Sequence, residues 1–466
     1  MTEKQKEKYP SVFTIDNFSS TATLATNEIK VPIGSQDTLN EKVYDPFEHR
    51  HVEHPNTFGG ALVHLIKSSL GTGILAIPRA FKSAGLVIGF IGTILIGLLC
   101  TYTIHLLVAA SQEMCRRTKK PSLGFAETAE AVVKHGPKKI QGWSKSARNF
   151  VEIALLLTYY VGNAVYIVFI ATSIKQLIDY LEPSISDWSD RLYMLIIMVP
   201  LVLCCQVRQL KHLVPFSFIA NTAMVVAFAI TLYYTFKEVK DVDLDKVDKF
   251  KDISGIPSFF STVIFAMEGI GTVMPVENSM VKDKFIGCPG VLNSAMTVVV
   301  ALYSIIGLFG YMAYGEATEA TITKNLPIDE IPAQVAKLCI SVAVFFTFML
   351  QFYVPMDITW RKISHKIREE RQNIGQIVLR TLAVFCITGI AIAAGEHLGP
   401  LIDLVGAIFF STLGLLVPAV IDTIVHWEGD KGFGYWKVWK NVFIGILAIF
   451  GLVTGSYYAI LAMTEE

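Results

Sequence analysis

Eleven long apolar segments dominate the sequence from residue 58 onward. Each comes close to the ~20 residues that a helix needs to cross the hydrocarbon core of a bilayer. Charged residues are gathered in the connections between the segments and make up only 17% of the chain, whereas soluble domains contain about a quarter. Hydrocarbon offers no hydrogen-bond partner to an exposed backbone group, so the sequence predicts an all-α polytopic membrane protein. The predicted spans are about 58–79, 86–110, 149–174, 192–206, 213–236, 257–280, 289–314, 333–356, 376–395, 399–424 and 438–462.

The connections between the segments differ in charge. Connections 111–148 and 357–375 are rich in lysine and arginine, whereas 175–191 and 315–332 are acidic or mixed. Basic connections stay on the cytoplasmic side of a membrane, so the N-terminus is predicted to be cytoplasmic and the C-terminus extracellular or luminal. Residues 1–57 are polar with few apolar runs, and they are predicted to form a disordered cytoplasmic tail.

Two of the apolar segments are interrupted by a pair of glycines followed by a proline. Gly71–Gly73 precedes Pro78 in the first segment, and Gly269–Gly271 precedes Pro275 in the sixth. Glycine adds backbone entropy and proline removes a donor, so both weaken a helix. Eleven spans divide as five, five and one, which puts the breaks at matching places in two halves of opposite orientation. Paired breaks of this kind predict a solute-binding site near the bilayer midplane.

The chemistry of a broken helix suggests which solute would bind there. Unwinding at the first break would expose backbone N–H groups and the positive end of a half-helix dipole to a carboxylate. Carbonyl groups freed at the other break would accept an ammonium group, so a zwitterionic amino acid fits. The competing interpretation is that the glycines only let helices pack closely.

Tyr159 and Tyr160 would wall a small pocket or serve as packing aromatics. The predicted substrate-binding residues are Gly71, Thr72, Gly73, Tyr159, Phe265, Glu268, Gly269, Ile270 and Gly271.

Three ionisable residues near the breaks are candidates for proton coupling: His64, Lys67 and Glu268. Histidine titrates near neutral pH, and ionisable groups inside a membrane usually face a bundle interior or a water path. Alternatives remain for each: His64 bonded to a helix carbonyl, Lys67 paired with a carboxylate or acting as a fixed charge, and Glu268 capping exposed N–H groups. Glu277 and Asp357, near predicted cytoplasmic ends, are interpreted as gate or snorkelling charges.

Several functional classes find no support in the sequence. Lys+Arg and Asp+Glu both number 40, so no basic surplus points to nucleic acid. The chain has no HExxH, GxSxG or GxxxxGK[ST] pattern and no CxxC pair among its 7 cysteines, which predicts neither an enzyme nor a metal or cofactor site.

The residues around the breaks also resemble a known family. The stretch 64–78, with His64, Lys67 and Gly71–Gly73, is similar to the first-helix motif of the proton-coupled amino-acid transporters. These belong to the amino acid/auxin permease group of the amino acid–polyamine–organocation (APC) superfamily. The stretch 265–278 resembles their sixth helix. Two further stretches, Asn325–Pro327 and Gln351–Pro355, resemble later segments of the family.

This resemblance implies a LeuT-like fold over residues 58–462 with helices 1 and 6 unwound. Its 5+5 inverted repeat would cover about 58–236 and 257–424, with one extra helix at 438–462. It also implies symport of small neutral amino acids, of the glycine, alanine and proline type, toward the cytoplasm, with the proton gradient as energy source and no cofactor. The family's proton-coupling histidine falls on His64. Like insect members, the chain lacks a luminal cysteine pair.

The resemblance further implies a plasma-membrane or lysosomal and late-endosomal location and growth-signalling partners. Tyr44-Asp45-Pro46-Phe47 resembles a tyrosine-based sorting signal, which predicts sorting adaptors as partners. Two alternatives stay open: a sodium-coupled or exchanging transporter of the same fold, and an amino-acid sensor that transports slowly and signals.

Overall fold

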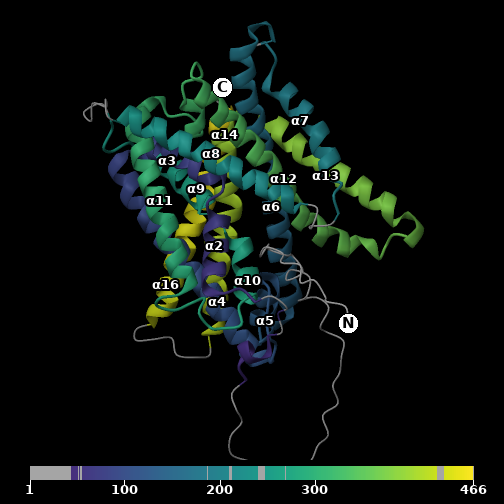
Figure 1. The fold of residues 1–466 in the computed structure, drawn as a ribbon. Helices are drawn as coiled ribbons and strands as arrows, with labels where there is room; N and C mark the ends of the chain where they lie inside the picture. The colour runs from purple at the N-terminus through teal and green to yellow at the C-terminus, as the bar shows by residue number, and fades with distance from the viewer. Residues whose placement is uncertain are drawn as a thin grey trace, which may run out of the picture.

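The described part of the chain is built of helices and contains no strand (Figure 1). The predicted tail up to residue 43 and the predicted site residue Glu268 lie outside it. The computed structural model describes residues 44–50, 52, 55–185, 187–208, 213–239, 247–267, 269–427 and 435–464.

The long uninterrupted helices match predicted spans, and all except α11 run past at least one predicted end. α4 continues to Thr118, where Arg116 and Arg117 occupy its last turn and favour the helix dipole. A helix satisfies its own backbone in water as in lipid, so apolarity alone underestimated these lengths. The uninterrupted helices are α4 (Leu86–Thr118), α6 (Ser144–Leu181), α8 (Val214–Val239), α11 (Val291–Tyr314), α12 (Ile331–Ser364) and α13 (Gln372–Ala394).

Two further spans contain π-helical segments. Gly406–Leu416 is π-helical between α14 and α15, and Gly451–Gly455 is π-helical between α16 and α17. The two segments pack against each other. The remaining α-helices outside the breaks are α5 (Phe125–Lys134), α7 (Asp190–Cys204), α14 (Leu398–Val405), α15 (Val417–Val425), α16 (Trp436–Phe450) and α17 (Ser456–Thr464). Short 3-10 turns lie at Pro46–His49, Gln141–Trp143, Pro183–Ile185, Ile253–Gly255, Gly315–Ala317, Ile322–Asn325 and Glu369–Arg371.

The first predicted broken segment changes direction at its glycines. α2 (Phe58–Ser69) is followed by a 3-10 segment, Thr72–Ala76, and by α3 (Ile77–Ala84). The two halves meet at 44°. Pro78 lies in the first turn of α3, where its missing N–H costs no helical hydrogen bond. The proline therefore starts the second half of the segment.

The second predicted broken segment is also in two pieces. α9 (Ile256–Ala266) ends just before the predicted glycine pair, and α10 (Ile270–Asn278) begins within it. This segment lies at the centre of the bundle: 82% of its most apolar stretch is buried, against 17% for the stretch in α8. α3 and the 3-10 segment pack on α9, while α11 packs on both α2 and α3.

The structure does not settle the predicted number of spans. Nine helices of the described chain are long and apolar enough to cross a membrane, and the bent pair formed by α2 and α3 makes ten. The predicted fourth span corresponds to α7, which has only 15 residues. A count of eleven spans therefore stays a prediction.

A methyl group at Gly406 should destabilise this fold, whereas one at Gly414 in the same π-helical segment should not. A Cβ at Gly406 would lie 2.1 Å from the Ser261 carbonyl oxygen on α9, but nothing lies within 4 Å of a Cβ at Gly414. We expect Gly406→Ala to lower the free energy of unfolding by about 1–3 kcal/mol, the usual range for overpacking. Thermal melting of the purified protein in detergent measures this. Equal melting temperatures for Gly406→Ala and Gly414→Ala would contradict the packing.

Candidate functional site

The two broken segments touch at their breaks. A Cβ added at Gly73 would lie 2.6 Å from the Ala266 Cα, so only glycine allows this approach. Ala266 is the last residue of α9, and Gly73 lies at the start of the 3-10 segment. Thr72 beside it is buried. The two helix breaks, which are far apart in the sequence, thus lie at one place in the fold.

A tyrosine on α11 bridges the ends of both first halves. The Tyr303 hydroxyl donates to the Ala266 carbonyl oxygen at 2.7 Å and also contacts the Ser69 carbonyl oxygen. Ser69 and Ala266 are the last residues of α2 and α9, and the last carbonyls of a helix have no intrahelical partner. Tyr303 is fully buried. A single hydroxyl, with one hydrogen to donate, therefore lies against one freed carbonyl from each break.

A second polar contact joins α10 to α2. The Thr272 hydroxyl lies 3.0 Å from the Ser68 hydroxyl and 2.9 Å from the Gly269 carbonyl oxygen. It lies on the first turn of α10. The start of α10 is therefore positioned against the end of α2 by side chains from both breaks.

A small pocket lies beside the breaks. The Tyr159 hydroxyl on α6 occupies the space next to Gly271, where a Cβ would lie only 2.3 Å from it. Tyr159 and Phe265, both predicted substrate-binding residues, line the pocket together. Gly71 is not part of this lining, and nothing lies within 4 Å of its Cβ position. The pocket is lined by Thr158, Tyr159, Gly162, Asn163, Tyr166, Phe265, Gln351 and Phe410.

The predicted proton-coupling residues lie on α2, ahead of the first break. His64 is half-buried and Lys67 is exposed, and both precede the last residue of α2, Ser69. Neither lines the described pocket. Glu268, the third candidate, lies outside the described residues. A proton-coupling role for these residues stays a prediction.

An ion pair whose carboxylate is buried lies on one side of the breaks. The Arg79 guanidinium on α3 binds both carboxylate oxygens of Asp403 on α14, at 3.2 and 3.0 Å. Two hydroxyls of α9 complete the cluster, since Ser258 donates to Asp403 at 2.7 Å and Thr262 also donates to it. The Asp403 side chain is 3% exposed. Gly399 leaves the room for Arg79, because a Cβ there would lie 2.4 Å from its Nε.

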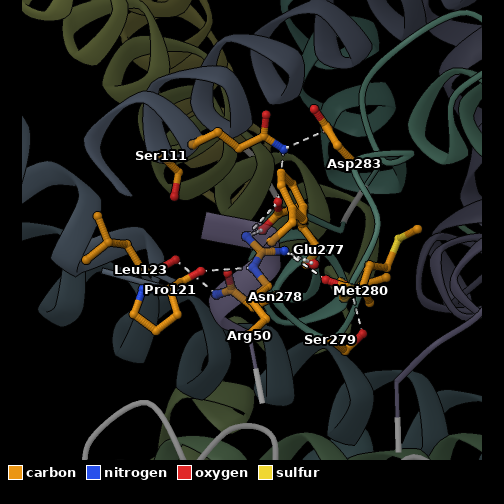
Figure 2. Close-up of polar contacts among 12 residues, drawn as sticks. Arg50, Ser111, Pro121, Leu123, Glu277, Asn278, Ser279, Met280 and Asp283 are labelled. Carbon is orange, nitrogen blue, oxygen red and sulfur yellow. Dashed lines mark hydrogen bonds and ion pairs between the residues drawn. The ribbon is translucent and has the colours of Figure 1, made fainter. Parts of the chain in front are cut away.

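A second ion pair lies on the other side of the breaks, at the end of α10 (Figure 2). Arg50 Nη2 lies 3.0 and 3.1 Å from the two carboxylate oxygens of Glu277. Their side chains are 2% and 1% exposed. Arg50 also donates to the carbonyl oxygens of Pro121, Glu277 and Met280, and Gln112 donates to Glu277 at 3.0 Å. Both charges therefore have the hydrogen bonds that burial demands.

The segment that carries Arg50 differs from the prediction for residues 1–57. Pro46–His49 forms a 3-10 turn that packs on α4. Phe47 is 6% exposed, and its ring lies 4.3 Å from the Arg50 guanidinium carbon. Burial raises the pKa of the Tyr44 phenol. The last part of the predicted tail is thus docked on the helices, and the predicted sorting sequence Tyr44–Phe47 lies within it.

Sequence reasoning missed most of the polar residues in these clusters, and four of them are central: Asp403, Arg79, Tyr303 and Arg50. Asp403 carried a usable signal, because an ionisable residue within an apolar run is a functional candidate by default. Arg79 follows Pro78 directly and carried the same signal. Tyr303 is one of 17 tyrosines and has no distinguishing pattern. Arg50 lies in a polar stretch where nothing marks it, although its partner Glu277 was interpreted as a gate or snorkelling charge.

Comparison with known proteins identifies the family of this chain. The family described as "Transmembrane amino acid transporter protein" matches residues 54–461. The chain belongs to this family. The family consists of amino acid transporters, a class of protein that is distinct from enzymes.

Two relatives of the transporter align over most of its length. The "Proton-coupled amino acid transporter-like protein pathetic" of Drosophila melanogaster is 41% identical over 429 residues, which cover 91% of this chain and 89% of the relative. The "Probable amino acid transporter skat-1" of Caenorhabditis elegans is 23% identical over 423 residues, 87% of this chain and 90% of the relative.

A solved structure is similar to the transporter in fold. The inward-facing conformation of Mhp1 matches with a TM-score of 0.51 and 14% identity, and covers 92% of this chain and 94% of Mhp1. The transporter thus has the predicted LeuT-like, all-α fold. At this identity, the similarity concerns the fold alone.

Removal of the Tyr303 hydroxyl should impair the transporter far more than removal of a similar hydroxyl on the same helix. Tyr303→Phe removes the one hydrogen that the buried carbonyls of Ser69 and Ala266 share, at a cost of about 1–3 kcal/mol for the lost donor. Tyr311, also on α11, donates to Glu316 at 3.1 Å, so Tyr311→Phe is a matched control. Melting temperature and amino-acid uptake in proteoliposomes measure the effect. Uptake by Tyr303→Phe equal to that of Tyr311→Phe would contradict the bridging role.

Proposed function

We propose that this protein is a secondary transporter that carries a small neutral amino acid together with a proton toward the cytoplasm. The observation that carries the proposal is the meeting of two helix breaks beside a pocket lined by Tyr159 and Phe265. Membership of an amino acid transporter family supports the substrate class. The name of the Drosophila relative, proton-coupled, supports the driving ion. The expected substrates are of the glycine, alanine and proline type.

The breaks offer complementary groups to the two charges of an amino acid. In the described chain, no side chain caps the turn that starts at Gly71 or the one that starts at Gly269. Backbone N–H groups at such starts favour an anion, here the substrate carboxylate. The substrate ammonium would face carbonyl oxygens of the same breaks. Gly71, Thr72, Gly73, Gly269, Ile270 and Gly271 are the proposed backbone contacts, with Glu268 as a further candidate.

The two ion pairs, one fully and one largely buried, would supply closures for an alternating mechanism. Arg79–Asp403 ties α3 to α14 on the α9 side of the break, and Arg50–Glu277 ties the N-terminal segment to the far end of α10. Separation of a buried ion pair is costly unless water or another partner replaces it. Opening one side at a time, with the other ion pair intact, would give the substrate access to alternate sides of the membrane.

The proposed proton-binding residue is His64, with Lys67 as a fixed positive charge nearby. Both lie on α2, the half-helix whose end meets the breaks. A proton that enters with the substrate would move through the membrane potential, which adds ~2.3 kcal/mol per charge for each 100 mV. Neutral amino acids would therefore accumulate without sodium.

Uptake by purified protein in proteoliposomes tests this proposal. We expect alanine, glycine and proline to accumulate when the outside is acidic, and uptake to fall at least tenfold when the pH gradient is collapsed. His64→Ala should lose this pH dependence while it still reconstitutes normally. His135→Ala, an exposed histidine on a connection, is the control. Uptake that ignores the proton gradient would contradict the coupling, and a normal gradient response in His64→Ala would remove His64 from it.

Sodium coupling or exchange is the alternative driver within the same fold. Replacement of sodium by choline at fixed pH separates the two possibilities. Loss of uptake without sodium would favour a sodium-coupled transporter, and uptake that depends only on internal amino acid would favour an exchanger.

A sensor role is the second candidate function, and one observation favours it. Arg50 joins the end of the predicted cytoplasmic tail to α10, a half-helix of the site, so substrate-dependent movement of α10 would reach the tail. Deletion of residues 1–43 leaves this contact intact and should abolish growth signalling while uptake continues. Unchanged signalling would contradict the sensor role. Sorting adaptors at Tyr44–Phe47 and a plasma-membrane or lysosomal and late-endosomal location are proposals separate from the sensor role. Because Phe47 is buried in this structure, an adaptor would bind only after this segment is released.

A further inference from the structure

One polar side chain in the pocket has no partner within the described protein. Asn163 on α6 is only 1% exposed, and neither its Oδ1 nor its Nδ2 makes a hydrogen bond there. It lines the pocket beside Tyr159 and Phe265. By contrast, the nearby Thr158 hydroxyl already donates to the Ala154 carbonyl oxygen at 2.7 Å. Asn163 thus presents an unused donor and an unused acceptor to the pocket.

An unsatisfied buried amide destabilises a protein and calls for an explanation. Replacement of such a group by an apolar side chain of the same shape is often neutral or stabilising. A folded chain therefore gains nothing from Asn163 unless another molecule completes its hydrogen bonds. Because an amide both donates and accepts, its natural complement is a hydroxyl or another amide.

The position of Asn163 indicates which part of a bound amino acid it would meet. Asn163 and Tyr159 are four residues apart on α6, so they share a face and are separated by about 6 Å along the helix axis. The Tyr159 hydroxyl lies against Gly271, in the break itself. The short side chain of an amino acid held at the break, together with one hydrogen bond of about 2.9 Å, would cover a comparable distance to the Asn163 amide. Gly162 leaves space there, since nothing lies within 4 Å of its Cβ position.

We propose that Asn163 recognises the side chain of the transported amino acid and selects small substrates that carry a hydroxyl or amide, such as threonine, over apolar substrates of the same shape, such as valine. This inference rests on the proposed function, because it assumes that an amino acid binds at the breaks. It adds that the pocket discriminates by hydrogen bonding as well as by size. A substrate of the same shape that lacks the group leaves the polar atoms of the amide unpaired and therefore binds more weakly. Smaller substrates such as glycine and alanine leave room for a water molecule to pair with the amide, so they remain substrates.

Threonine and valine have nearly the same shape, so their competition isolates the hydrogen bond. In proteoliposomes we expect the transporter to prefer threonine over valine about tenfold, the equivalent of one net hydrogen bond. Asn163→Leu, which keeps the size of the side chain, should bring this ratio close to one. Thr172→Val is the matched control on the same helix, because Thr172 is buried and its hydroxyl is satisfied by the Phe169 carbonyl oxygen. It should leave the ratio unchanged.

The melting temperature of Asn163→Leu without substrate supplies a second readout. A purely structural role of Asn163 predicts a lower melting temperature for this variant, whereas a role in substrate binding does not. If Asn163 serves substrate, Asn163→Leu should melt at the same or a higher temperature than the native protein. Threonine should raise the melting temperature of the native protein more than valine does, and Asn163→Leu should lose this difference. This binding readout also holds for a protein that reconstitutes poorly.

The outcomes separate this inference from the proposed function. Equal use of threonine and valine by the native protein, or an unchanged ratio in Asn163→Leu, would overturn the role of Asn163 while amino-acid transport stands. A lower melting temperature for Asn163→Leu together with an unchanged threonine preference would make Asn163 a structural residue. Failure of every amino acid to be taken up or to shift the melting temperature would contradict the proposed function itself.

Discussion

The structure depends on how backbone groups freed by two helix breaks are satisfied in the middle of a bundle. The carbonyls of Ser69 and Ala266 end α2 and α9 at the same place, and one buried hydroxyl, that of Tyr303, contacts both. Gly73 allows the close approach that puts them there. Because no water is present in hydrocarbon to hydrogen-bond such groups, the breaks are stable only as a pair. The position of the pocket beside them follows from that pairing.

The charged residues extend the same arrangement to the two ends of the broken segments. Arg79–Asp403 and Arg50–Glu277 lie on opposite sides of the break between α9 and α10, and each ties a half-helix or its flanking segment to a neighbour. Each carboxylate has further donors, from Ser258 and Thr262 in one cluster and from Gln112 in the other. Such buried ion pairs contribute little net stability but strongly favour one arrangement of their partners. This is the property that a closure between two states requires.

Much of this arrangement could be predicted from the sequence. The rest could not, for physical reasons. Apolar length predicted the long helices, and the glycines marked both breaks, because local composition controls whether a helix continues. Tyr159, Phe265 and Gly271, all predicted to bind substrate, lie near each other in the fold, and their role in binding stays a prediction. Partners of distant chain position, such as Tyr303, Arg50 and the orphaned amide of Asn163, depend on packing between helices, which no local pattern encodes. Helix ends were also missed, since a helix continues past the membrane wherever its residues allow.

The central claim is that the amino acid binds where the two breaks meet. Gly71 lies at this point with open space where a Cβ would be, so Gly71→Cys places a thiol there without a clash. With the exposed cysteines Cys288 and Cys386 replaced by serine, the rate of its modification by a membrane-permeant maleimide reports access to the breaks. Saturating amino acid should slow this reaction at least tenfold. An unchanged rate in protein that still takes up the amino acid would contradict a binding site at the breaks.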